Sequence, residues 1–142
     1  MPGTPQPAPP SHPKILLVED DENVRAMIVA HLERRLSNAE VIPVPDAKRA
    51  LQALEKSDVD LILSDFHLPD MNGLEFLTKA RRAYPSAKRV MLTGAPDEGL
   101  AVDASREAGI DRFFVKPLQM EAFAHAVKGL LAQGAGRRPP PR

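Results

Sequence analysis

The 142-residue sequence has no cysteine and no tryptophan, and its formal charges cancel, because 19 Lys and Arg residues balance 19 Asp and Glu residues. The absence of cysteine excludes a disulfide framework, a thiolate metal site and a cysteine nucleophile, and it fits a reducing compartment. The absence of a positive surplus argues against attachment to nucleic acid or acidic lipid through bulk charge. Any binding should therefore be local and specific.

Long apolar runs are also absent. No stretch approaches the roughly 18 apolar residues that a membrane span needs. The first 13 residues contain neither Lys nor Arg and no apolar segment of the kind found in secretory signals. We therefore expect a cytoplasmic protein without membrane insertion.

Proline is concentrated at the two ends of the chain. Of the 15 prolines, six precede residue 14 and three follow residue 138. Residues 1–13 and 134–142 have too little apolar content to fold, so we expect two disordered tails around one domain at residues 14–133. The Arg and Pro residues of the C-terminal tail could suit an acidic partner or a groove that binds Pro-rich peptides, although a merely solubilising tail is the simpler expectation.

Between the tails, short apolar runs alternate with longer amphipathic stretches. The apolar runs predict five strands, at 15–18, 41–44, 61–63, 90–92 and 113–115. The amphipathic stretches predict five helices, at 22–37, 46–55, 73–83, 97–107 and 119–132. Strands that alternate with helices in this way predict an α/β fold with a parallel sheet and helices on both of its faces.

The second predicted strand contains Pro43 and is followed by Pro45. A proline cannot donate a ladder hydrogen bond in a central strand, so this strand should lie at an edge of the sheet. That placement suits the doubly wound order 2-1-3-4-5, as in flavodoxin-like folds. Ligands of such sheets bind outside the carboxyl ends of the strands, near the point between strands 1 and 3 where the order reverses.

Polar residues stand at the carboxyl ends of four predicted strands. Glu19 and Asp20 follow the first strand, Asp65 follows the third, Thr93 the fourth and Lys116 the fifth. Three carboxylates in one crevice repel one another unless a cation lies between them, and their oxygens favour Mg²⁺ or Mn²⁺. The lysine and the hydroxyl group would then suit the oxygens of a phosphoryl group.

Each of these residues has an ordinary explanation when it is taken alone. The run Glu19–Asp21 could be a cap that complements a helix dipole, and we expect that role for Asp21. Asp65 could be a loop residue, and Thr93-Gly94 could be a turn. Their joint occurrence, each close behind a predicted strand and in the right order, favours a functional site.

Four segments carry a family resemblance: residues 15–22, 61–75, 91–94 and 108–118. Through them the chain resembles the receiver domains of two-component response regulators, in the stand-alone form typical of chemotaxis, over about residues 14–132. The resemblance implies that Asp65 accepts a phosphoryl group from a sensor histidine kinase. It also implies a Mg²⁺ ion held by Glu19, Asp20, Asp65 and the backbone carbonyl of His67.

The resemblance assigns further roles around the phosphoacceptor. Lys116 and Thr93 would contact the phosphoryl oxygens, and Phe113 would change rotamer when Thr93 moves. Pro117 matches a cis Lys–Pro bond of the family. His67 and Ala95 would flank the path of the hydrolytic water and so influence the lifetime of the acyl phosphate.

The expected function is a phosphorylation-dependent switch that signals through contacts with an unidentified output protein. Such a protein is a phosphoacceptor that catalyses its own phosphorylation and dephosphorylation, and no direct contact with nucleic acid is expected. One alternative is a phosphorelay intermediate that passes the phosphoryl group to a histidine phosphotransfer protein. Another is a fragment of a larger regulator, and a third is a scaffold that binds through its tails, which the intact set of site residues argues against.

Overall fold

The computed structural model describes residues 12–94 and 106–135 of the chain. Its elements, in chain order, are β1 (Lys14–Val18), α1 (Glu22–Arg35), β2 (Glu40–Val44), α2 (Ala47–Lys56), β3 (Leu61–Asp65), α3 (Gly73–Ala83), β4 (Lys88–Thr93), β5 (Arg112–Val115) and α5 (Met120–Ala135). Residues 106–108 are also helical. Most of the helix predicted at 97–107, and most of both predicted tails, lie outside the described residues.

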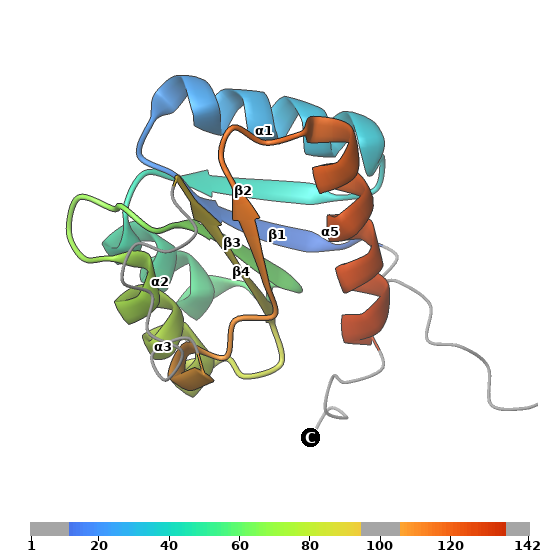
Figure 1. Cartoon of the computed structure of the whole chain (residues 1–142). Helices are drawn as coiled ribbons and strands as arrows, with labels where there is room; N and C mark the ends of the chain where they lie inside the picture. The colour runs from blue at the N-terminus through green and yellow to red at the C-terminus, as the bar shows by residue number, and fades with distance from the viewer. Residues whose placement is uncertain (1–11, 95–105, 136–142) are drawn as a thin grey trace, which may run out of the picture.

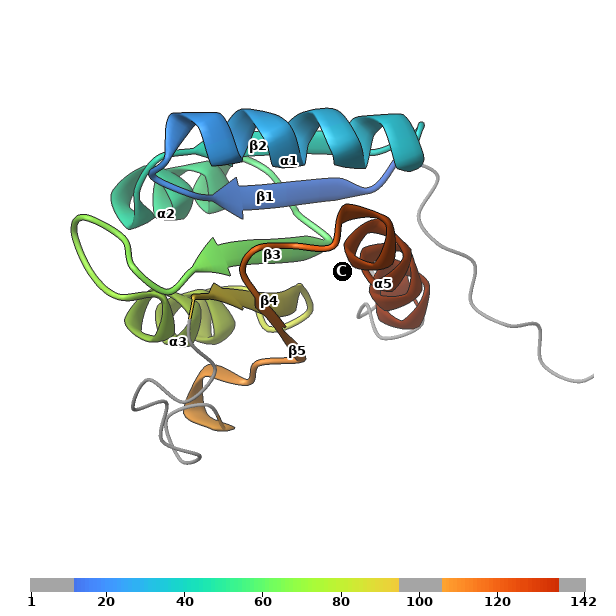
Figure 2. The same ribbon diagram turned by 45° about the horizontal axis from the view of Figure 1, so that its top comes forward.

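The five strands form one parallel sheet in the order β2-β1-β3-β4-β5, which confirms the predicted topology. Helices α1 and α5 cover one face of the sheet, and α2 and α3 cover the other (Figures 1 and 2). Because all strands are parallel, their carboxyl ends meet at one edge, and the loops that follow β1, β3, β4 and β5 start there.

Alternate residues of the strands feed two separate apolar cores. Ile15 and Leu17 point into the core shared with α1 and α5, and Leu16 and Val18 point into the core shared with α2 and α3. All four side chains have no solvent exposure. Burial of each such side chain stabilises the fold by about 1.5–3 kcal/mol. The carboxyl ends of the central strands are therefore held in a fixed position.

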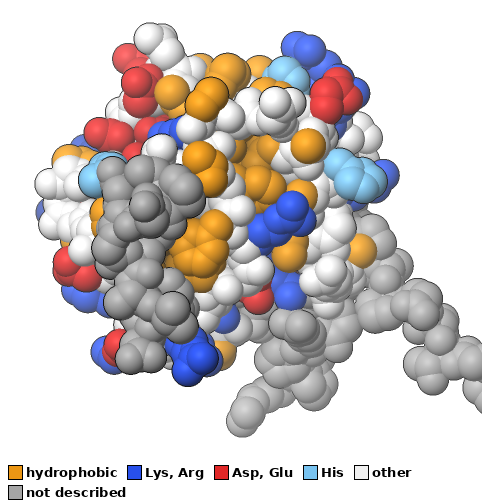
Figure 3. Space-filling model, viewed as in Figure 1, with side chains coloured by type: hydrophobic (Ala, Val, Ile, Leu, Met, Phe, Trp, Pro, Cys, Tyr) orange, Lys and Arg blue, Asp and Glu red, His pale blue; other side chains and the backbone are white. Residues whose placement is uncertain are grey.

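The two edges of the sheet differ in character. Strand β2 is an edge strand, as expected from its prolines, and Pro43 pairs with Leu17 of β1. At the other edge, β5 leaves Phe113 39% exposed and Val115 48% exposed. Hydrophobic side chains gather on this face around β5 (Figure 3).

Side-chain caps fix where three helices begin. The Asp21 carboxylate accepts hydrogen bonds from the backbone N–H groups of Asn23 and Val24, which confirms its predicted capping role at α1. Asp46 caps α2 and Asn72 caps α3 in the same way. Within the described residues, no helix is both long and apolar enough to cross a membrane.

Candidate phosphoacceptor site at the carboxyl ends of the strands

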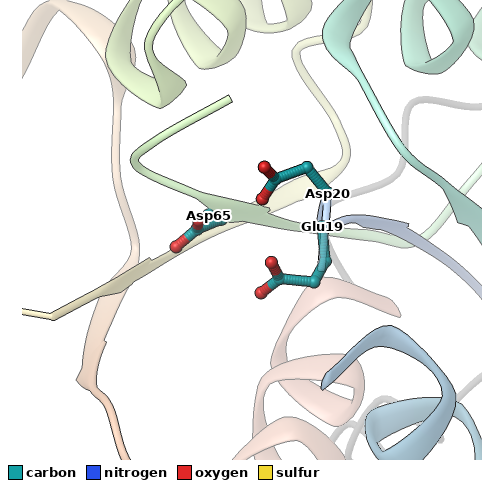
Figure 4. A group of neighbouring side chains, drawn as sticks. All are labelled: Glu19, Asp20 and Asp65. Carbon is teal, nitrogen blue, oxygen red and sulfur yellow. The ribbon is translucent and has the colours of Figure 1, made fainter. Parts of the chain in front are cut away.

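Three carboxylates converge where β1 and β3 end (Figure 4). Glu19 and Asp20 follow β1 directly, and Asp65 is the last residue of the neighbouring strand β3. One oxygen of each lies within 4.8 Å of the others. Glu19 and Asp65 are buried and Asp20 is exposed, so the cluster has a closed inner side and an open outer side.

Lys116 enters the cluster from the end of β5. Its ammonium nitrogen Nζ lies 2.6 Å from Oε1 of Glu19 and 3.1 Å from Oδ1 of Asp65. The second oxygen of Glu19, Oε2, accepts a hydrogen bond of 3.1 Å from the backbone N–H of Asp21. Both Glu19 oxygens are thus engaged within the protein, and the positive charge lies between two of the three carboxylates.

Burial and the neighbouring charges have opposite effects on the pKa values of Glu19 and Lys116. Burial raises the pKa of the Glu19 carboxyl, and the hydrogen bonds from Lys116 and Asp21 offset this only in part. Burial alone would lower the pKa of Lys116, but the hydrogen bond to Glu19 and the charge of Asp65 outweigh it and raise that pKa. Lys116 is therefore a permanent cation at physiological pH.

Thr93 occupies the end of β4, next to β3. Thr93 is buried, and the residue before it, Leu92, pairs with Asp65 of β3. The carbonyl of Thr93 accepts a hydrogen bond of 2.8 Å from the backbone N–H of Lys116. Phe113 lies on β5 opposite Met91. The bond between Lys116 and Pro117 is cis, as the family resemblance implies.

The β3–α3 loop folds back on the strand that carries Asp65. The backbone N–H of Gly73 donates to the carbonyl of Phe66 at 2.7 Å, and His67 forms an isolated antiparallel bridge with Asn72. His67 itself is exposed. The loop therefore holds the backbone of His67 in a defined position two residues after Asp65.

Two residues at the site have roles that sequence reasoning missed. The Arg25 guanidinium, on α1, donates to the backbone carbonyls of Glu19 and Asp20. The Asp70 carboxylate, in the β3–α3 loop, accepts hydrogen bonds from the first two N–H groups of α2. A cation in the first turns of a helix opposes the helix dipole, so the placement of Arg25 was a signal that could have been noticed.

Comparisons with known proteins agree with this geometry. Residues 15–128 match the family model of the response regulator receiver domain. The chain is 31% identical over 118 residues to the chemotaxis protein CheY of Listeria monocytogenes, covering 81% of this chain and 95% of that protein. It is 33% identical over 114 residues to the transcriptional regulatory protein FlgR of Helicobacter pylori, covering 80% of this chain and only 28% of that longer protein.

A solved structure shows the same likeness. The signal receiver domain of an HD domain-containing protein from Pseudomonas fluorescens superposes with a TM-score of 0.78 and 34% sequence identity, covering 91% of this chain and 93% of that one. The fold, the strand-end residues and the matched family model agree over the same part of the sequence. The chain belongs to the response regulator receiver domain family.

Proposed function

We propose that this receiver domain is a signalling switch in which the Asp65 carboxylate accepts a phosphoryl group from the phosphohistidine of a sensor kinase. The observation that carries the proposal is the environment of Asp65. This buried carboxylate has a lysine ammonium at 3.1 Å and lies within 4.8 Å of two further carboxylates. A purely structural aspartate would have no need for two more acids beside it.

The carboxylate cluster fits a divalent metal ion by its chemistry. Its donors are hard oxygens, and Mg²⁺ commonly takes one or two carboxylates together with waters and phosphate oxygens. Because both oxygens of Glu19 are already engaged, we assign direct contacts to Asp20 and Asp65, and contact through water to Glu19. The backbone carbonyl of His67 would complete the protein ligands, and Mn²⁺ would suit the same set.

The reaction is an in-line displacement at phosphorus. An oxygen of the Asp65 carboxylate forms the new P–O bond while the P–N bond of the phosphohistidine breaks, and its electron pair stays on the imidazole nitrogen of the kinase. Lys116 and Thr93 stabilise charge on the phosphoryl oxygens, and a metal ion held by the carboxylates would neutralise more of it. Water later hydrolyses the acyl phosphate and restores the carboxylate.

The output is carried by protein contacts. Thr93 and Phe113 connect the phosphoryl group to the β5 edge, where Phe113 and Val115 are exposed. A relay that passes the phosphoryl group to a histidine phosphotransfer protein would use the same site, and transfer from labelled protein to such a domain distinguishes the two functions. The relatives include a protein of about this length and a much longer one. The matched region is 95% of the CheY of Listeria monocytogenes but only 28% of FlgR.

The test is phosphorylation by acetyl phosphate with Mg²⁺, followed by intact mass. We expect one added phosphoryl group on the wild type and on the control Asp58→Asn, which changes an exposed loop aspartate. We expect none on Asp65→Asn, since the amide keeps the shape but is not a nucleophile, and none on the wild type in EDTA. Full labelling of Asp65→Asn would overturn the site assignment.

A further inference from the structure

We propose that Arg25 is a positioning residue for metal binding, which aligns the acidic pair after β1 by binding the backbone behind it. The proposal rests on the proposed function, because it concerns the same carboxylate cluster. Arg25 touches none of the reacting atoms in the mechanism above. Its contacts are with the peptide groups that carry Glu19 and Asp20.

Arg25 contacts three consecutive carbonyl groups of the β1–α1 turn. Its Nη1 donates to the carbonyl oxygen of Glu19 at 2.8 Å and approaches that of Asp20 at 3.4 Å. Its backbone N–H donates to the carbonyl of Asp21 at 2.9 Å. The guanidinium of this half-buried residue therefore holds the carbonyl groups of Glu19 and Asp20, whereas its backbone N–H makes a helix hydrogen bond that its substitution would leave in place.

The carboxylates of Glu19 and Asp20 are held in position by different means. The backbone N–H of Glu19 donates to Val44 of β2 at 3.1 Å, and its side chain is held by Lys116 and Asp21. Asp20 is exposed, so packing does little to fix its carboxylate and the backbone must set its direction. The Arg25 contacts are thus most important for Asp20.

The charge of Arg25 makes the proposal testable by the sign of an effect. A cation beside the cluster repels a divalent metal ion, so electrostatics alone predicts that removing the charge tightens metal binding. Positioning predicts the opposite, because residues that orient metal ligands typically contribute about 10- to 100-fold to affinity. The two explanations cannot both describe the same variant.

The decisive measurement is Mn²⁺ binding to the full chain, followed by the EPR signal of the free ion at fixed ionic strength. We expect Arg25→Met to bind Mn²⁺ about 10-fold or more weakly than the wild type. The matched control is Arg34→Met, which removes the same charge from an exposed position near the other end of α1. It should bind Mn²⁺ as well as the wild type or slightly better.

A second variant and a stability measurement separate positioning from general support of the fold. Arg25→Lys keeps the charge but replaces the planar fork with one ammonium group, so we expect Mn²⁺ affinity between those of the wild type and Arg25→Met. Urea unfolding of each variant shows how much of the chain is folded. Unchanged or tighter Mn²⁺ binding by Arg25→Met would overturn the proposal, whatever its stability.

The outcome is separable from the proposed function. If the wild type binds Mn²⁺ and is labelled on Asp65 while Arg25→Met binds Mn²⁺ equally well, only the positioning role fails. If the wild type binds no divalent ion, or Asp65→Asn is still labelled, the proposed function fails.

Discussion

The backbone of Gly73 lies directly against the carbonyl oxygen of Asp65. A Cβ placed on Gly73 would be 2.5 Å from that oxygen and 3.0 Å from the Cα of Phe66. Neither neighbour can move easily, since both belong to the strand and loop that carry Asp65. Gly73, the first residue of α3, therefore packs closely against the backbone of Asp65.

We expect Gly73→Ala to lower the free energy of unfolding by about 1–3 kcal/mol, the usual cost of overpacking, and to slow labelling by acetyl phosphate. Gly129→Ala is the matched control, because a Cβ there meets nothing within 4 Å and the residue lies within α5. That change should stabilise the protein by about 0.5–1 kcal/mol. Urea unfolding measures both effects, and equal effects of the two substitutions would refute the packing argument.

Asp70 connects the β3–α3 loop to the start of α2. Its two carboxylate oxygens accept hydrogen bonds from Ala47 at 3.1 Å and Lys48 at 2.8 Å, while Asp46 caps the next N–H group. Partial burial would raise the pKa of Asp70, but its backbone hydrogen bonds outweigh this and lower the pKa below 3.8. The folded state therefore releases this proton more readily than the unfolded chain.

We expect Asp70→Asn to cost about 0.5–2 kcal/mol of stability at pH 7, because the amide keeps only one of the two acceptor oxygens and loses the negative charge at the start of α2. The contribution of Asp70 is fully present above its unfolded pKa near 3.8 and is lost as pH falls through the lower folded value. The difference between wild type and variant should therefore shrink in acid. Urea unfolding from pH 7 to pH 3 measures this, with Asp58→Asn as control, and a constant difference would contradict it.

The burial of Glu19 gives a pH dependence of the other sign. Burial raises the pKa of Glu19 above 4.5, so the folded state keeps this proton to higher pH and stability falls as pH rises through that interval. Lys116→Met removes the cation that offsets burial, so the fall should become larger. In EDTA, we expect near-equal stability at pH 4 and a deficit of about 1–3 kcal/mol at pH 7. Lys128→Met, at an exposed position of α5, should show no such trend.

The proposed coupling from Thr93 to Phe113 can be followed by NMR, because the chain has only five phenylalanines. With fluorinated phenylalanine, the ¹⁹F NMR signal of Phe113, assigned by Phe113→Leu, should shift when the wild type is phosphorylated. Phosphorylated Thr93→Ala should show a smaller shift, because it lacks the hydroxyl group that distinguishes the two states. A lost coupling of ~1–3 kcal/mol corresponds to roughly a 5- to 150-fold change in partner affinity. Equal shifts in both proteins would exclude this route.

Strand β4 shows where sequence patterns stop being informative. The apolar run predicted a strand at 90–92, but β4 spans Lys88–Thr93, and both Lys88 and Arg89 are buried. The Arg89 guanidinium donates to the carbonyls of Ala87, Pro85 and Gly109. A charged residue is predicted to be exposed unless its hydrogen-bond partners are known. One partner of Arg89, Gly109, lies 20 residues further along the chain, so the sequence around β4 does not reveal it.

The candidate site was more predictable than the strand boundaries. Its acids and its lysine stand at strand ends, so the order of a parallel sheet is enough to bring them together. Arg25 and Asp70 act through backbone groups of other elements. The position of Arg25 near the start of a helix was a signal in the sequence, but only the folded backbone shows which carbonyl or N–H group faces each side chain.

The prolines of β2 have a consequence for how the molecule meets other proteins. An exposed sheet edge invites another chain to add a strand, and this is a common start of aggregation. Pro43 has no N–H group to offer at that edge, and Pro45 ends the strand directly after Val44. This edge therefore offers another chain fewer backbone donors than an edge strand without proline would.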